Sequence, residues 1–279
     1  MDGPAYDAEA FTAFEARGWD AVAEGYRDFL VPLTSRLVEP LLDAAGVGPG
    51  TRVLDVATGP GPVAARAAER GAHAVGVDLA PGMIALAARL HPNAEFIVAD
   101  AERLPFPDDS FDAVVAGLAV LHLARPEQAL AEWARVLRPG GRLAVSMWAE
   151  PGANRSIGIV FDAAQEAGVP PPPDLPAGPP LFRFSDESEL AGLLRSAGLA
   201  EITVTPVAFT HRFPGPAETW QGILESTVRT RALVAGQPEE VQRRMRATFE
   251  RLAREYERDG GLELPVAALI ASGRRPPGG

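Results

Sequence analysis

Between Thr51 and Met147 the sequence alternates short apolar runs that favour β-strands with longer helical stretches. Strands are predicted at 53–56, 73–77, 95–99, 112–116 and 142–147, and the helices between them at 62–70, 81–90 and 126–137. Such alternation is typical of a parallel sheet with helices on both of its faces. The spacing therefore predicts an α/β fold of the Rossmann-like, doubly wound type.

The rest of the chain is predicted to cover and complete this sheet. Two late strands, at 201–210 and 265–272, would make it a mostly parallel seven-stranded sheet, and the long helical or Pro-rich segments between them are typical of lids. We expect five parts: an N-terminal helical cover (1–48), a core (49–150), a lid insertion (151–184), the C-terminal part of the core sheet (185–213 and 259–274) and a helical lid insertion (214–258).

Composition excludes several kinds of chemistry. All 26 basic residues of the 279 are Arg, so a Schiff-base lysine, a P-loop lysine and a Tyr-x-x-x-Lys dehydrogenase site are ruled out. The absence of cysteine removes thiol nucleophiles and zinc thiolate sites. The net charge of −11 disfavours nucleic acid as a partner, because phosphate contacts need clustered basic side chains.

The N-terminus does not resemble a signal peptide, since Asp2, Asp7 and Glu9 precede any apolar run. No apolar segment approaches membrane-spanning length. We therefore expect a soluble, cytoplasmic protein with no membrane partner, acting as a monomer or a homodimer.

The predicted strands end in acidic residues. Asp55 closes the first strand just before a glycine-rich turn, and Asp78 and Asp100 close the second and third. Glycines in such a turn let a ligand lie against bare backbone. Because doubly wound sheets bind ligands at the carboxyl edge of their strands, the three acids are expected to line a ligand site.

The charge of these acids favours one cofactor over another. Gly59-x-Gly61-x-x-Ala64 also satisfies the dinucleotide fingerprint, but Asp55 would repel a pyrophosphate, and no hydride-transfer machinery is evident. S-adenosylmethionine has no phosphate, and it carries a sulfonium, an ammonium, a ribose diol and an adenine. It is the cofactor that the three acids suit.

Five motifs stand in order along the chain: 54–61 (LDVATGPG), 76–78 (GVD), 98–106 (VADAERLPF), 110–112 (SFD) and 135–141 (RVLRPGG). Together they resemble the class I S-adenosylmethionine-dependent methyltransferases, in particular the type-11, quinone-biosynthesis C-methyltransferase-like subgroup and actinobacterial small-molecule methyltransferases. The resemblance is strong over about residues 15–150. One departure is Ala57, which stands where the family usually has its first glycine.

The resemblance implies roles for individual residues. The methionine part of the cofactor would lie against Asp55, Ala57, Gly59 and Gly61, with Gly117 and Leu118 beneath it. Asp78 would bind the ribose hydroxyls. Leu79 and Met83 would lie against the adenine, and Asp100, beside Ala101 and Glu102, would accept a hydrogen bond from its amino group. Trp19 and Tyr26 of the N-terminal helix are weighed as a cover over the cofactor or as plain packing on the sheet.

The methyl acceptor is less constrained by the sequence. His122, which follows the fourth strand, is a candidate general base or a packing residue, and His211 is a weaker candidate. The aromatic residues proposed for the substrate pocket are Trp148, Phe182, Phe184 and Trp220. No metal is expected, because no Asp-Asn pair indicates a magnesium site.

The expected activity is methyl transfer to a small molecule, with O-methylation of a secondary metabolite as the first hypothesis. C-methylation of a quinone-like or polyketide ring is the alternative within the same class. A different class also stays open, a protein that retains the cofactor and catalyses a step other than methyl transfer.

Overall fold

One sheet of eight strands forms the centre of the described molecule. The computed structural model describes residues 6–170, 172 and 175–277; residues 1–5 of the predicted N-terminal cover and 171, 173 and 174 of the predicted lid lie outside the described residues. The strands are β1 (Arg52–Val56), β2 (His73–Asp78), β3 (Glu95–Val98), β4 (Phe111–Gly117), β5 (Leu137–Trp148), β6 (Ala200–Phe213), β7 (Glu257–Arg258) and β8 (Gly261–Arg274).

The strand order is β3-β2-β1-β4-β5-β8-β6, with the short β7 paired to β8. The first five strands of this order run parallel, and β8 is antiparallel to both β5 and β6. The structure confirms the predicted Rossmann-like, doubly wound and mostly parallel sheet. The predicted number of seven strands is corrected to eight, because the chain folds back from β7 into β8 as a hairpin.

β5, β6 and β8 are each longer than the sequence indicated. β5 begins at Leu137, which pairs with Phe111, so residues 138–141, which separate the helix predicted at 126–137 from the strand predicted at 142–147, are part of the strand. β8 runs over fourteen residues because it pairs with β6 from Leu262 onward, well before the predicted start at Pro265. Pairing with a neighbouring strand, parallel at Leu137 and antiparallel at Leu262, supplies partners for backbone groups whose local sequence gives no strand pattern.

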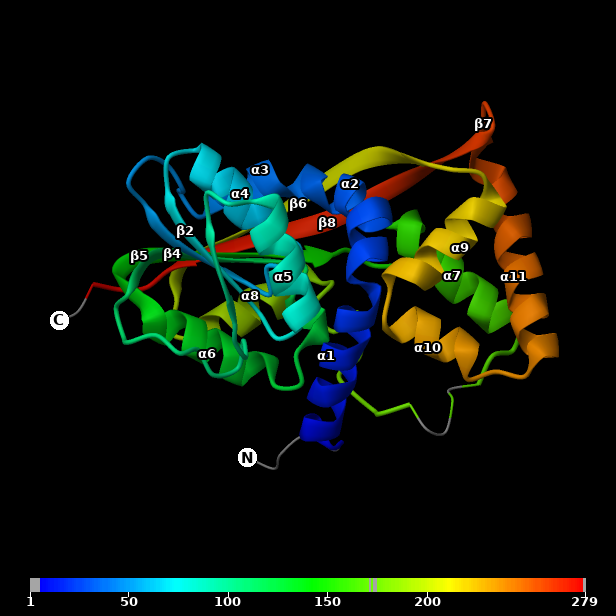
Figure 1. Cartoon of the computed structure of the whole chain (residues 1–279), viewed down its shortest axis with the longest axis horizontal. Helices are drawn as coiled ribbons and strands as arrows, with labels where there is room; N and C mark the ends of the chain where they lie inside the picture. Colours follow the sequence, from blue (N-terminus) through cyan, green and yellow to red (C-terminus); the bar gives the residue numbers. More distant parts are fainter. Residues whose placement is uncertain (1–5, 171, 173–174, 278–279) are drawn as a thin grey trace.

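Helices cover both faces of the sheet (Figure 1). α3 (Val38–Ala44) and α4 (Pro62–Glu69) lie on one face, and α6 (Pro126–Val136) and α8 (Glu187–Ser196) on the other. α5 (Pro81–Leu90) packs beside β2 and β3. Side chains alternate along β1, so that Val53 joins the apolar cluster of the first face and Leu54 that of the second.

A second group of helices lies beyond the sheet. It consists of α7 (Arg155–Glu166), α9 (Pro216–Ser226), α10 (Arg229–Ala235) and α11 (Glu239–Ala253). α1 (Ala8–Gly25) stands between this group and the sheet and contacts both α5 and α9 (Figure 1). It continues into a π-helical turn (Tyr26–Leu30), α2 (Val31–Thr34) and one 3₁₀ turn (Ser35–Leu37) that leads to α3.

Two glycines allow the close approach of α1 and the α9–α10 segment. A Cβ atom on Gly18 would lie 2.2 Å from Cγ1 of Val228, and one on Gly25 would lie 2.2 Å from the carbonyl oxygen of Glu225. No larger side chain fits at these positions without moving the helices apart. The approach holds the polar side chains of α1 against the start of α10.

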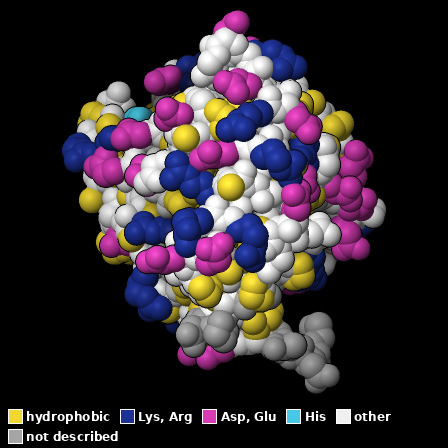
Figure 2. Space-filling view, turned by 90° about the vertical axis from the view of Figure 1, so that its right-hand side faces the viewer, with side chains coloured by type: hydrophobic (Ala, Val, Ile, Leu, Met, Phe, Trp, Pro, Cys, Tyr) yellow, Lys and Arg dark blue, Asp and Glu magenta, His cyan; other side chains and the backbone are white. Residues whose placement is uncertain are grey.

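The surface over α11 is finely mixed in charge. Figure 2 shows Arg and acidic side chains interspersed on this face, where Arg243 pairs with Glu240 at 2.8 Å and Arg246 with Glu250 at 2.7 Å. Within the described ranges, no helix combines the length and the apolar character needed to cross a membrane.

Candidate active site

A large cleft opens at the carboxyl edge of the parallel strands, and its volume is about 1620 Å³ including the space open to solvent. Its floor consists of the segments that follow β1, β2, β3 and β4, together with Trp148 at the end of β5. Its roof consists of α1, the π-helical turn, α2, α7, Leu181, Phe213 and the α9–α10 segment. The floor comes from one continuous stretch of the chain, residues 57–148, and the roof from several distant segments.

Asp55 lies beneath the glycine-rich turn and is 1% exposed. Its Oδ2 accepts hydrogen bonds from the hydroxyl of Thr58 at 2.5 Å and the backbone N–H of Ala64 at 3.0 Å. Its Oδ1 is buried without a partner among the described residues, at a smaller pocket that adjoins the cleft. Burial raises the pKa of Asp55 to about 7, although these two hydrogen bonds oppose the rise.

The turn after β1 follows a left-handed course. Ala57 has a φ of 54°, which is strained for a residue with a Cβ and which explains why a glycine is the easier choice there. Gly59 also has a φ of 54°, and a Cβ on it would meet nothing within 4 Å, so its bare backbone faces open space. Gly61 lies outside the cleft lining; a Cβ there would lie 2.8 Å from the ring of Phe96.

Asp78 faces the cleft from the end of β2. Its two oxygens accept the backbone N–H groups of Gly59 and Ala80, each at 2.9 Å. Burial raises the pKa of Asp78 against the effect of these hydrogen bonds. The carboxylate is therefore fixed in orientation, with lone pairs left for a ligand.

The turn after β3 is held by its own acids. Asp100 Oδ1 accepts the N–H of Glu102 at 2.8 Å. Glu102 in turn pairs with Arg125, whose backbone N–H and guanidinium approach its two oxygens at 2.7 and 3.1 Å. Both acids line the cleft, and Glu102 also ties the β3 turn to the start of α6.

Most of the other residues predicted to bind the cofactor also line the cleft: Trp19, Tyr26, Leu79, Met83, Ala101, Gly117 and Leu118. Trp19 and Tyr26 pack against Met83 and Leu86 of α5 as one apolar cluster. Their rings meet edge to face, with centroids 5.4 Å apart. They belong to the roof of the cleft and to the packing of α1 at the same time.

A hydrogen-bonded chain joins roof and floor at His122. The Nδ1 of His122 lies 3.0 Å from Oε2 of Glu15 on α1, and the same oxygen accepts the indole N–H of Trp19 at 2.9 Å. The rings of Trp19 and His122 also meet edge to face, 4.9 Å apart. The Glu15 side chain is only 5% exposed, so a buried carboxylate holds the imidazole in place.

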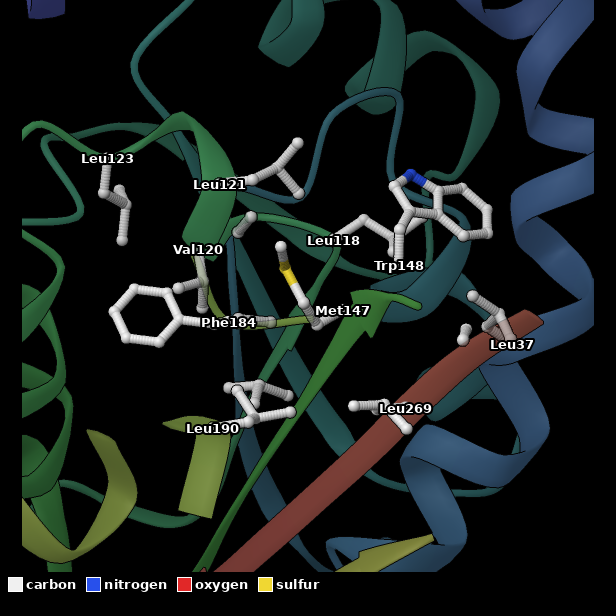
Figure 3. Packing of buried hydrophobic residues seen from close by; sticks show 14 of the residues in the cluster. Leu37, Leu118, Val120, Leu121, Leu123, Met147, Trp148, Phe184, Leu190 and Leu269 are labelled. Atoms are coloured by element: carbon white, nitrogen blue, oxygen red, sulfur yellow. The ribbon is translucent and has the colours of Figure 1, made fainter. Parts of the chain in front are cut away.

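Several predicted residues lie elsewhere. His211 packs on Phe213 behind the cleft, and burial lowers its pKa. Phe182 stacks edge to face on Phe161, Trp220 packs on Phe249, and Phe184 lies among Val120, Met147 and Leu190 in the core (Figure 3). Of the four aromatic residues predicted for the substrate pocket, the structure brings only Trp148 to the lining. Phe184 and Trp220 are instead buried in the apolar core, and Phe182 is half-buried.

Sequence reasoning missed two charged residues of the roof, Glu15 and Arg229. The sequence pattern could have identified Glu15. It stands four residues from both Phe11 and Trp19, so a carboxylate interrupts the apolar face of this helix. No such pattern identifies Arg229, because nothing in its local sequence distinguishes it from the other arginines of this chain.

The donor set of the floor fits S-adenosylmethionine. The buried, unpaired Oδ1 of Asp55 suits a cationic group, and the oriented carboxylate of Asp78 suits a diol. Leu79, Met83 and Ala101 offer apolar contact for an adenine. The open space over Gly59 leaves room for the ligand backbone.

Comparison with known proteins agrees with this site. Residues 54–145 match the family model described as a methyltransferase domain. The demethylmenaquinone methyltransferase of Renibacterium salmoninarum is 42% identical over 118 residues, which cover 42% of this chain and 50% of the relative. That of Thermus thermophilus is 44% identical over 116 residues, covering 39% and 52%. The chain thus spans about half the length of these curated relatives.

Solved structures share the fold at lower identity. The YcgJ protein of Bacillus subtilis superposes with a TM-score of 0.55 at 19% identity, over 87% of this chain and 99% of that one. The [4+2]-cyclase SpnF gives a TM-score of 0.52 at 24% identity, over 88% and 81%. Residues 54–145 thus form a methyltransferase domain of the class I S-adenosylmethionine-dependent type, similar to that of quinone-biosynthesis enzymes, and the cofactor of this domain is S-adenosylmethionine.

Proposed function

We propose that this chain transfers a methyl group from S-adenosylmethionine to a hydroxyl oxygen of an apolar small molecule, with His122 as the general base. The observation that carries the proposal is the 3.0 Å contact between His122 Nδ1 and the buried carboxylate of Glu15. It lies in a cleft whose floor is the carboxyl edge of the sheet and whose remaining wall is largely apolar.

In this proposal the floor holds the cofactor. Asp55, Ala57 and Gly59 contact its methionine part, and Gly61 supports that turn from behind. Asp78 accepts the ribose hydroxyls, which its lining position and fixed orientation support. Leu79 and Met83 contact the adenine, Asp100 accepts its amino group, and Gly117 and Leu118 lie beneath the methionine end.

When bound, S-adenosylmethionine supplies a methyl group on a positively charged sulfonium. The chain itself contributes position, exclusion of water and a place for a proton. A carboxylate can only accept, so Glu15 requires the hydrogen of His122 to be on Nδ1 and leaves Nε2 free. Nε2 then takes the proton of the acceptor hydroxyl, a contribution that is typically worth about 10²–10⁴-fold in rate.

The predicted lid segments, 151–184 and 214–258, are proposed to enclose the acceptor. Support comes from Ile157, Val160, Phe161 and Ile223, which present apolar side chains to the cleft from α7 and α9. An acceptor with a ring or a chain of apolar carbons matches this wall, because its surface leaves water on binding.

C-methylation of a quinone-like ring is the second candidate. The names of the curated relatives favour it, since demethylmenaquinone methyltransferases recur among them. Deprotonation by His122 serves this reaction too, because a phenolate is nucleophilic at its oxygen and at its ring carbons. A step other than methyl transfer is the third candidate, motivated by the same fold in a [4+2]-cyclase.

The test uses the full chain with S-adenosylmethionine and a panel of phenolic and polyketide-like acceptors. S-adenosylhomocysteine formation reports turnover, and NMR of a product labelled in its methyl carbon distinguishes O–CH3 from C–CH3. Calorimetry with S-adenosylhomocysteine provides the binding control. Binding without any methylated product across the panel would contradict methyl transfer and favour the third candidate.

A further inference from the structure

Arg229 places a guanidinium group at the same corner of the cleft as Glu15 and His122. It is the first residue of α10, and its Nη2 donates to the carbonyl oxygen of Pro179 at 3.1 Å. Its Nε lies 3.9 Å from Oε1 of Glu15, which is an ion pair but too long for a hydrogen bond. Its Nη1 is buried with no partner among the described residues.

One oxygen of Glu15 also lacks a hydrogen-bond partner among the described residues. Its Oε2 already binds Trp19 and His122, whereas its buried Oε1 accepts no hydrogen bond within the described chain. Unpaired buried polar atoms are costly, and the cost is larger for charged groups. The corner therefore gains stability from a ligand that brings its own polar groups, above all an oxygen atom that accepts from the Arg229 guanidinium.

Polar recognition in the acceptor half is concentrated at this corner. Thr12 lies one turn from Glu15 on α1, and Thr227 and Thr230 stand beside Arg229 in the sequence, whereas α7 contributes Ile157, Val160 and Phe161 and one polar residue, Ser156. Among the described residues of the lining, only Arg229 brings a full positive charge. An acceptor is thus expected to be apolar over most of its surface and rich in oxygen at the reacting end.

We propose that the reacting hydroxyl of the acceptor is conjugated to an adjacent carbonyl oxygen, as in an ortho-acyl phenol or an enolised 1,3-dicarbonyl compound, and that Arg229 binds this second oxygen. The inference rests on the proposed function, because it takes His122 as the base. When the O–H bond breaks, the proton moves to His122 Nε2 and the negative charge spreads over both oxygens. The guanidinium stabilises that anion by a charge-assisted hydrogen bond.

Three naphthols test this assignment. In 2-acetyl-1-naphthol the two oxygens are adjacent; in 4-acetyl-1-naphthol they are conjugated but far apart; 1-naphthol has no carbonyl. The first measurement is the dissociation constant of each naphthol in the complex with S-adenosylhomocysteine, followed by the absorbance of the bound anion. The second is kcat/KM for methyl transfer. The wild-type chain should prefer the first compound by about tenfold or more in both measurements, the factor expected for one additional charged hydrogen bond.

Substitution of Arg229 separates recognition from structure. Arg229→Gln should weaken the binding of 2-acetyl-1-naphthol roughly ten- to hundredfold, and the binding of 4-acetyl-1-naphthol by no more than about twofold. Arg231→Gln, which removes the same charge from the exposed face of α10, is the matched control and should change neither. Arg229→Lys keeps the charge, so its affinity for 2-acetyl-1-naphthol should lie between those of the wild-type chain and Arg229→Gln. It provides the comparison if the glutamine variant does not fold.

The outcomes distinguish this inference from the proposed function. Equal losses for all three naphthols in Arg229→Gln, or no preference for the adjacent oxygens in the wild-type chain, would overturn it even if methyl transfer occurs. If no naphthol is methylated but 2-acetyl-1-naphthol binds in an Arg229-dependent way, the assignment of Arg229 to the carbonyl oxygen holds, and methyl transfer is contradicted. If none of the three binds, the inference is overturned as well.

Discussion

The floor and the roof of the cleft are built on different principles. The acidic and glycine residues of the floor come from 55–118, a single stretch in which adjacent parallel strands end side by side. The roof brings α1 at the start of the chain against α9 and α10, which lie some two hundred residues further on. The local alternation of strands and helices produces the floor, and the packing of segments that are distant in the sequence produces the roof.

The two halves also differ in how their polar groups are paired. On the floor, both oxygens of Asp78 and Oδ2 of Asp55 accept backbone or hydroxyl hydrogens, and Oδ1 of Asp55 is the one carboxylate oxygen of these two residues left unpaired among the residues described. In the roof, Glu15 Oε1 and Arg229 Nη1 are buried without partners among the residues described. A largely satisfied floor suits a cofactor of constant structure, whereas an unsatisfied corner suits recognition of a particular acceptor.

The sharpest test of this contrast is at His122, where floor and roof meet. His122→Ala should lower kcat by about 10²–10⁴-fold, because the general base is lost. S-adenosylhomocysteine should still bind within about twofold by calorimetry, since the cofactor groups of the floor are intact. The loss in kcat should become smaller at alkaline pH, because the acceptor hydroxyl then ionises in solution without a base.

His73→Ala serves as the control for this substitution, because His73 is exposed at the opposite end of β2. It should leave kcat and affinity unchanged. Equal rates for His122→Ala and the wild-type chain at every pH would exclude His122 as the base.

Asp55 predicts a pH dependence that belongs to the floor alone. Its folded pKa of about 7 exceeds its ordinary value of 3.8, so the folded chain binds this proton more tightly than the unfolded chain. The stability from this group is full below its ordinary pKa and is lost as pH rises through about 7. Between pH 5 and pH 8 the cofactor-free chain should lose about 2–3 kcal/mol more in free energy of unfolding than Asp55→Asn does.

Urea unfolding at the two pH values measures this difference. If the free energy of unfolding changed with pH by the same amount in the wild-type chain and in Asp55→Asn, the prediction would be wrong. Asp55 would then already be ionised in the folded chain at pH 5.

Asp78→Ala should weaken S-adenosylhomocysteine binding by about 1–3 kcal/mol, since it leaves buried polar groups of the ligand and of Gly59 unmatched. Asp112→Ala is the control, because Asp112 accepts the backbone N–H of Arg52 and forms an ion pair with Arg138 at the opposite end of the sheet. It should affect stability and not affinity. An unaltered affinity in Asp78→Ala would remove the ribose role proposed for β2.

The smallest effect is expected for Trp19→Phe, which keeps an aromatic ring but loses the hydrogen bond to Glu15. The loss should raise the barrier for methyl transfer by about 0.5–1.5 kcal/mol, because Glu15 then holds His122 less firmly. Cofactor affinity should change less than kcat. The reverse pattern would assign Trp19 to the cofactor rather than to the His122 pair.

The sequence alone determined the sheet and its acidic edge. Strand and helix periods are local, and parallel strands end at a common edge, so Asp55, Asp78 and Asp100 follow from the pattern. The same reasoning failed for Phe184 and Trp220, because an aromatic side chain fits a core as well as a pocket. Only the fold reveals which space each one fills.

The tertiary structure decided what faces the acceptor. Glu15 and His122 are 107 residues apart, and Arg229 lies further still along the chain. Their meeting depends on the close fit of Gly18 against Val228, a steric match between two surfaces that no local period encodes. The sequence thus specified the cofactor through backbone geometry and charge, and the packing of distant helices specified the chemistry beside it.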